Sequence, residues 1–157
     1  MCSYFAKLAF GGDGSCKLCG VEEMERTHIF ISCPVINNIY NHFSPLFYAI
    51  SPDGMTQKEK IMGKKLENNK DNLSILRNYL TSSIKHIIYR NRNNKFTNAS
   101  ASLINLIKAF MKKDLTHRWW VACNNGKKDE FKNLYLQNDL IGSICTNDTL
   151  SFNFMDI

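Results

Sequence analysis

Three cysteines and one histidine stand close together near the start of the sequence, at Cys16, Cys19, His28 and Cys33. Thiolate sulfur and imidazole nitrogen are the ligands that Zn²⁺ prefers in a tetrahedral protein site. Two residues separate the first two cysteines, which lets a tight turn aim both sulfurs at one point, and Gly20 suits such a turn. The spacing predicts a zinc site of the Cys3His type.

Three other interpretations of these residues remain open. A disulfide requires an oxidising compartment, and residues 1–15 do not have the pattern of a secretory signal. A redox pair formed by Cys16 and Cys19 normally belongs to a βαβ unit, which the surrounding sequence does not predict. The third alternative is a buried structural histidine beside unrelated cysteines. The spacing of all four residues together favours zinc.

The residues around the four candidate ligands form a pattern that resembles a segment of a known protein family. The sequence has Cys-x-x-Cys-Gly at 16–20, Glu-Glu at 22–23, Arg-Thr-His-Ile-Phe at 26–30 and Ser-Cys-Pro at 32–34, with Tyr-Phe-Ala-Lys-Leu at 4–8 ahead of them. Over residues 4–43 this pattern resembles the zinc-binding segment near the C-terminus of reverse transcriptases from non-LTR (LINE-type) retrotransposons. The resemblance implies a segment that helps an upstream polymerase to hold template RNA or target DNA.

Composition is typical of a folded protein. Of 157 residues, 44% are hydrophobic and 11% aromatic, which is enough for a core. No apolar run approaches the ~20 residues that a membrane-spanning helix needs, so no membrane partner is expected. We expect a zinc-binding module over residues 1–47 and a helical domain over 48–157. Free thiols at Cys2, Cys123 and Cys145 fit a reducing compartment, and we expect an intracellular protein, nuclear or cytoplasmic.

Apolar periodicity predicts a mainly α fold, in which a small zinc knuckle precedes a helical domain and a short C-terminal β-hairpin. Helices are expected over 22–31, 35–43, 57–66, 73–92, 103–111 (with a continuation through Trp120 left open) and 127–136. Pro34 suits the first turn of the second helix, and Thr56 with Glu59 fits a capping box. Prolines and Gly54 favour an internal boundary within 44–54, and the hairpin is expected within 140–154.

Charge is distributed unevenly along the chain, whose formal net charge is +6. Residues 61–128 hold 14 of the 20 basic side chains and only 3 of the 14 acidic ones. Because Lys and Arg displace counterions from phosphates, RNA or DNA is the expected partner of this segment. The candidate phosphate contacts are Arg90, Arg92, Lys95, Lys112, Lys113 and Arg118. The alternative is that these side chains only solvate helix surfaces.

Two adjacent tryptophans, Trp119 and Trp120, follow Arg118 in this basic segment. Exposed indole rings beside an arginine can stack on nucleic-acid bases. Paired tryptophans in a helical region are more often part of the core, however, because each buries a large apolar area. We therefore predict that both belong to the core.

No catalytic constellation accompanies the cysteine cluster. A polymerase needs paired metal-binding carboxylates, and the sequence has no Tyr-x-Asp-Asp-like run. A weak nuclease candidate, Pro52-Asp53 with Glu67 and Lys70, falls where a helix is predicted instead of the strands that such a site needs. We therefore expect a chain that is not an enzyme. It is either a zinc-stabilised, nucleic-acid-associated tail of a reverse transcriptase or a zinc-stapled helical module that binds other proteins and no nucleic acid.

Overall fold

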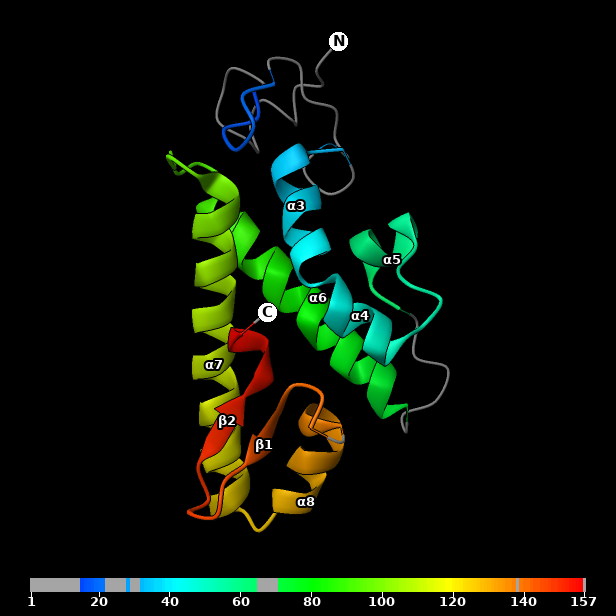
Figure 1. Cartoon of the computed structure of the whole chain (residues 1–157), viewed down its shortest axis with the longest axis vertical. Coiled ribbons are helices and arrows are strands. Elements are labelled where there is room, and N and C mark those ends of the chain that lie inside the picture. Colours follow the sequence, from blue (N-terminus) through cyan, green and yellow to red (C-terminus); the bar gives the residue numbers. More distant parts are fainter. Residues whose placement is uncertain (1–14, 22–27, 29–31, 65–70, 138, 157) are drawn as a thin grey trace.

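Two long helices, α6 (Asn72–Asn91) and α7 (Ala99–Asn124), form the centre of the fold (Figure 1). The computed structural model describes residues 15–21, 28, 32–64, 71–137 and 139–156. Side-chain caps begin both helices: Asp71 accepts a hydrogen bond from the amide of Ser74 and Asn98 from that of Ala101, each at 3.1 Å. The helix predicted over 73–92 is confirmed. The one predicted over 103–111 is longer than expected and passes Trp120.

The core lies where α6 and α7 pack against each other. One face of α7 is fully buried at steps of four residues, at Leu103, Ile107, Met111 and Leu115. The facing stripe of α6 contributes Leu76, Leu80, Ile84 and Ile88, each no more than 2% exposed. This spacing places the apolar side chains on one side of each helix. The predicted mainly α class is therefore correct.

Two shorter helices lie across this pair (Figure 1): α3 (Pro34–His42) packs against α7, and α4 (Ser44–Ile50) packs against α6. The prediction for α3 is confirmed, with Pro34 in its first turn. The segment 44–54, which was expected to contain the internal boundary, is mostly the helix α4. Pro45 stands in the first turn of that helix, where its missing N–H has no intrahelical partner to lose. The predicted division between residues 47 and 48 falls inside α4.

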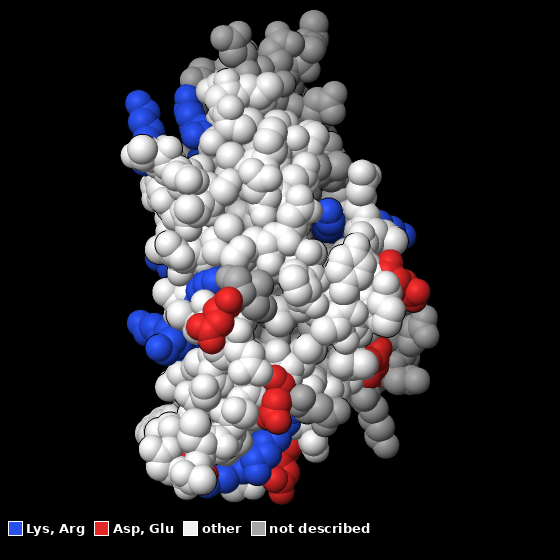
Figure 2. Space-filling view, viewed as in Figure 1, with Lys and Arg blue, Asp and Glu red and all other residues white. Residues whose placement is uncertain are grey.

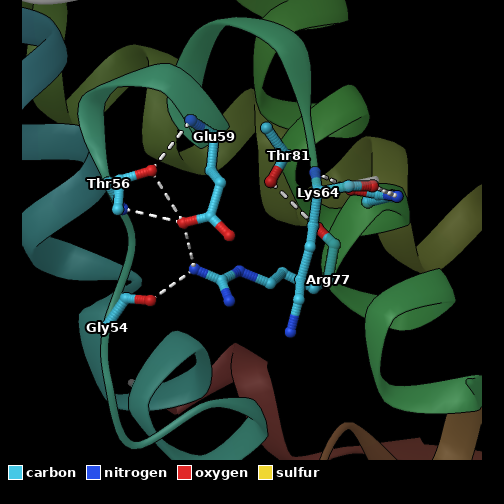
Figure 3. Close-up of polar contacts among 7 residues, drawn as sticks. Gly54, Thr56, Glu59, Lys64, Arg77 and Thr81 are labelled. Atoms are coloured by element: carbon cyan, nitrogen blue, oxygen red, sulfur yellow. Dashed lines mark hydrogen bonds and ion pairs between the residues drawn. The ribbon is translucent and has the colours of Figure 1, made fainter. Parts of the chain in front are cut away.

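Helix α5 (Gln57–Met62) begins with the predicted capping box. The hydroxyl of Thr56 accepts a hydrogen bond from the amide of Glu59 at 3.2 Å, and the Glu59 carboxylate accepts one from the amide of Thr56 at 2.9 Å (Figure 3). The buried guanidinium of Arg77 on α6 also reaches that carboxylate, at 3.2 Å, and donates to the carbonyl of Gly54. Polar contacts therefore attach α5 to α6. The helix ends at Met62, earlier than predicted, and Gly63 is its C-cap.

The C-terminal segment folds back along the second half of α7. It comprises α8 (Lys128–Phe131), a π-helical turn η1 (Lys132–Leu136), strands β1 (Gly142–Ile144) and β2 (Leu150–Phe152), and a 3₁₀ turn η2 (Asn153–Met155).

The two strands of this segment pair antiparallel, with Gly142 opposite Phe152, so the predicted hairpin is confirmed. A Cβ at Gly142 would lie 2.2 Å from the carbonyl oxygen of Ser151. Only glycine therefore fits this register.

The adjacent tryptophans have different surroundings. Trp119 is 5% exposed, as predicted, and its indole N–H donates to the carbonyl of Asp148 at 2.8 Å. Trp120 is 62% exposed, so its placement in the core is wrong. Neighbouring residues on a helix point about 100° apart, and only one of the two can face α8 and the hairpin. No helix in the described part of the chain is long and apolar enough to cross a membrane.

Candidate metal centre

A tight turn brings the first two cysteines together beside the start of α3 (Figure 1). The amide of Gly20 donates to the carbonyl of Cys16 at 2.7 Å, and the amide of Cys16 donates to the carbonyl of Val21 at 2.9 Å. Gly20 has φ +78°, a conformation that side-chain-bearing residues rarely adopt. Glycine at this position therefore allows the turn that presents the sulfurs of Cys16 and Cys19 together.

The other two residues of the cluster are joined by a second turn. The carbonyl of His28 accepts hydrogen bonds from the amides of Ser32, at 3.0 Å, and Cys33, at 2.8 Å. Cys33 is the N-cap of α3, and Pro34 starts the helix. The positive end of the helix dipole favours a thiolate at this position. The predicted helix over 22–31 lies outside the described residues, apart from His28, which is helical.

The two turns bring all four predicted residues to one point. The ligand atoms of Cys16, Cys19, His28 and Cys33 lie within 4.8 Å of one another. Cys19 Sγ and His28 Nε2 are 3.2 Å apart. Cys33 is fully buried, Cys16 is 2% exposed and His28 is 8% exposed. Four nitrogen and sulfur donors converging in a largely buried site can hold a metal ion.

The two buried sulfurs of this cluster are strongly coupled. The Cys33 thiol donates a hydrogen bond to the Cys16 sulfur, and with the amides of Cys19 and Leu18 it lowers the pKa of Cys16 to about 4. The same contact, together with burial, raises the pKa of Cys33. Two thiolates this close repel each other unless a cation lies between them. A metal ion bound by both sulfurs would displace the proton from their contact.

A hydroxyl fixes the orientation of the imidazole. Ser32 Oγ lies 3.1 Å from His28 Nδ1, while Nε2 faces the sulfur of Cys19. A hydrogen bond at one ring nitrogen sets which nitrogen is available to a metal, and it improves that nitrogen as a ligand. Ser32 was not predicted to have a role, although a residue four positions after a histidine can reach it across one turn of chain.

The cysteines of the described residues are free thiols, three in the cluster and two elsewhere, at Cys123 and Cys145. Cys2 lies outside the described residues. A disulfide between any two cysteines of the cluster would remove two of its four ligands. The converging donors therefore favour the metal interpretation over the disulfide.

The predicted phosphate contacts lie on the end of α6, the turn that follows it and α7. Arg90 and Lys95 are exposed where α6 leads into the turn before α7, and Lys112 and Lys113 are exposed on α7. Figure 2 shows basic side chains along the edge formed by this turn and α7, whereas most acidic side chains visible on that face lie over its centre and right. Basic groups distant in sequence are thus brought to one side.

Two of the predicted contacts are engaged with neighbouring groups. The guanidinium of Arg92 stacks on the ring of Tyr89, 3.9 Å from its centre. Arg118 donates to the carboxylate of Asp114 at 2.7 Å and to the hydroxyl of Tyr135 at 3.1 Å. An arginine already held in this way is a weaker candidate for a phosphate than Lys112 or Lys113.

The described residues do not support the nuclease alternative. Asp53 is exposed in the connection between α4 and α5, and no strand presents it. Glu67 and Lys70 lie outside the described residues.

No protein-family model, curated protein or solved structure matches this chain. Support for a function therefore comes from the chemistry of the metal cluster and of the exposed basic side chains on α6, α7 and the turn between them.

Proposed function

We propose that this chain is a zinc-stapled helical module that binds nucleic acid and that its metal centre is structural. In a tetrahedral site with Zn–S bonds of ~2.3 Å, neighbouring sulfurs lie about 3.8 Å apart. The spread of the four ligand atoms, up to 4.8 Å, needs only small side-chain adjustments to reach this arrangement. Three thiolates and one imidazole favour zinc over the harder cations Mg²⁺ and Ca²⁺, which take oxygen ligands.

A structural role follows from the number of ligands. Catalytic zinc sites use three protein ligands and leave the fourth position to water or substrate, whereas structural sites use four. Cys16, Cys19, His28 and Cys33 supply all four. We therefore assign zinc the task of closing the two turns and fixing the start of α3.

The observation that carries the nucleic-acid proposal is the unopposed positive charge of α7. Its sequence contains a single acidic residue, Asp114, whose carboxylate pairs with Arg118 at 2.7 Å. No ion pair within the described part of the chain involves Lys112 or Lys113. These two ammonium groups, with Arg90 and Lys95 further along the same edge, are available to phosphates. Release of condensed counterions would favour that contact.

The resemblance of residues 4–43 to the tail of LINE-type reverse transcriptases suggests the biological setting. There, the module would hold template RNA or target DNA for polymerase domains located upstream. It would contribute binding and positioning but no catalytic group, because the sequence offers no carboxylate pair for polymerase metals.

The test is binding of the purified, zinc-loaded chain to a labelled single strand and a labelled duplex across a salt series. A variant with Lys112→Gln and Lys113→Gln should bind more weakly and show a shallower salt dependence, by about 0.7–0.9 in log–log slope for each lost phosphate contact. The matched control replaces Lys58 and Lys64, which are exposed and lie near α5 on the other side of the molecule, with glutamine. It changes net charge equally and should affect binding less.

Absence of binding at low salt would contradict the proposal, as would an equal effect of both double variants. The second result would show that only overall charge matters.

A groove favours one alternative function. A hollow of about 450 Å³ lies between the last turns of α7 and α8 with η1, and apolar side chains at Val121, Ala122, Phe131 and Leu134 line much of it. Such a groove suits an apolar side chain of a protein partner. A chain that retains zinc but binds neither nucleic-acid probe would move our assignment to a protein-interaction module.

A further inference from the structure

Trp120, the exposed tryptophan of α7, contributes far less to the core than its neighbour Trp119. Trp119 packs on Phe131, with ring centres 5.3 Å apart, and its N–H is satisfied by the carbonyl of Asp148. Trp120, which points about 100° away from Trp119 around the helix, leaves 62% of its surface to solvent. An indole held on a rigid helix in this way is a preformed apolar surface.

The surroundings of Trp120 combine a flat aromatic surface with positive charge. The imidazole of His117 stacks on the indole with ring centres 6.2 Å apart and planes inclined by 21°. Lys113, His117 and Trp120 follow one another at steps of four and three residues, so they share one exposed face of α7. The only acidic residue of the helix, Asp114, is paired with Arg118.

We propose that Lys113, His117 and Trp120 bind an unpaired base of single-stranded nucleic acid. The base stacks on the indole, and Lys113 contacts the adjoining phosphate. Every base has an aromatic face, so such a surface binds single strands with little sequence preference, whereas a duplex hides the faces of its bases. This inference rests on the proposed function and names its substrate class.

Charge and composition favour a nucleic-acid strand over an apolar protein segment on this face. Thr116 and Lys113 are exposed one and two turns before Trp120 on α7, on the same side as the indole. A protein partner that covered this face would have to desolvate the ammonium group of Lys113, whereas a phosphate would pair with it.

The test compares three labelled probes on the zinc-loaded chain: an oligothymidylate, a strand of equal length built from abasic nucleotides, and a duplex. Trp120→Ala should weaken thymidylate binding about fivefold or more and leave the abasic strand unaffected. Trp120→Phe should retain most of the affinity, because phenylalanine still offers a ring. The control Tyr48→Ala removes a ring of similar exposure, 59%, from α4 and should change neither affinity.

Fluorescence gives a second readout, because the chain has two tryptophans. Thymidylate should quench the emission of the wild-type chain and not that of Trp120→Phe, in which only the buried Trp119 emits.

The failures of the two proposals are distinguishable. Thymidylate binding that is unchanged in Trp120→Ala but weakened in the Lys112→Gln, Lys113→Gln variant would overturn the stacking site and leave the proposed function standing. A wild-type chain that binds the thymidylate no better than the abasic strand would also overturn it. A wild-type chain that binds no probe would overturn both proposals.

Discussion

The metal centre and the helical body hold their structures in different ways. In the metal centre, turns of a few residues at Cys16–Val21 and His28–Cys33 present four donors whose atoms lie within 4.8 Å. In the body, side chains far apart in sequence are buried together where α6 packs against α7, and Ile107 of α7 is fully buried. A cation would stabilise the first arrangement, whereas the second depends on the removal of apolar surface from water.

Helix α3 belongs to both regions. Its N-cap is the candidate ligand Cys33, while its side chains Ile36 and Ile39 are no more than 1% exposed within the body's core. A metal bound at the cluster would therefore position the start of a helix that the body already holds by packing. We infer that the boundary of metal dependence lies at Cys33, at the start of α3.

Cys19→Ser should have the largest effect, because it would remove one ligand of the proposed zinc ion, whose binding would contribute on the order of 10 kcal/mol of free energy to folding. We expect fast hydrogen exchange at the amides of Cys16, Gly20 and Cys33, while α6 and α7 keep their protection. Hydrogen exchange followed by mass spectrometry measures this segment by segment. Equal loss of protection in α7 would show that the body also depends on the metal.

Ile107→Ala tests the helical body. Removing a fully buried isoleucine side chain should lower the free energy of unfolding by about 2–5 kcal/mol, measured by urea denaturation. The control Leu106→Ala truncates a neighbour that is 39% exposed and should cost much less. Release of zinc from the folded Ile107→Ala chain would contradict the independence of the two regions.

Ser32→Ala should act on the metal centre alone. Without its hydrogen bond to Nδ1, the imidazole of His28 is less well oriented, and affinity for zinc should fall about 10- to 100-fold. Competition with a chromophoric chelator measures the change, and Ser82→Ala, on the exposed side of α6, serves as the control. Unchanged affinity would mean that the serine has no part in the site.

Glu59→Gln should have the smallest effect, about 1 kcal/mol at neutral pH, because glutamine keeps the capping box and loses only the charge facing Arg77. Hydrogen bonds from Thr56 and the charge of Arg77 lower the pKa of Glu59. Its stabilising contribution is therefore complete above the ordinary glutamate pKa of about 4.3 and is lost as pH falls through the lowered value. The difference between variant and wild type should vanish at low pH, and a difference that persists there would contradict this account.

Local patterns in the sequence were sufficient to predict the convergence of the four candidate ligands, α3, the capping box and the hairpin. Each depends on residues only a few positions apart, such as Pro34 after Cys33 or Glu59 after Thr56. Helix α4 was missed because Pro45 and Pro52 suggested an internal boundary, whereas a proline in the first turn costs a helix little. Its apolar residues Phe47 and Ile50 were the available signal.

What could not be predicted depends on contacts between distant elements. The pairing of Arg77 with Glu59 needs α5 to lie on α6, and the burial of Trp119 but not Trp120 needs the position of α8 and the hairpin. Arg118 was predicted to contact phosphate, yet Asp114 and Tyr135 already engage it. Net charge along a sequence does not reveal which cations have protein partners.

Native mass spectrometry of the chain, prepared with zinc and without added reductant, tests the central claim that Cys16, Cys19, His28 and Cys33 hold a zinc ion. The account predicts one zinc per wild-type chain and none retained by Cys19→Ser, while Cys145→Ser, at an exposed cysteine outside the cluster, keeps the metal. A wild-type chain without metal, lighter by the hydrogens lost in a disulfide, would contradict the account. So would zinc retained equally by Cys19→Ser and the wild type.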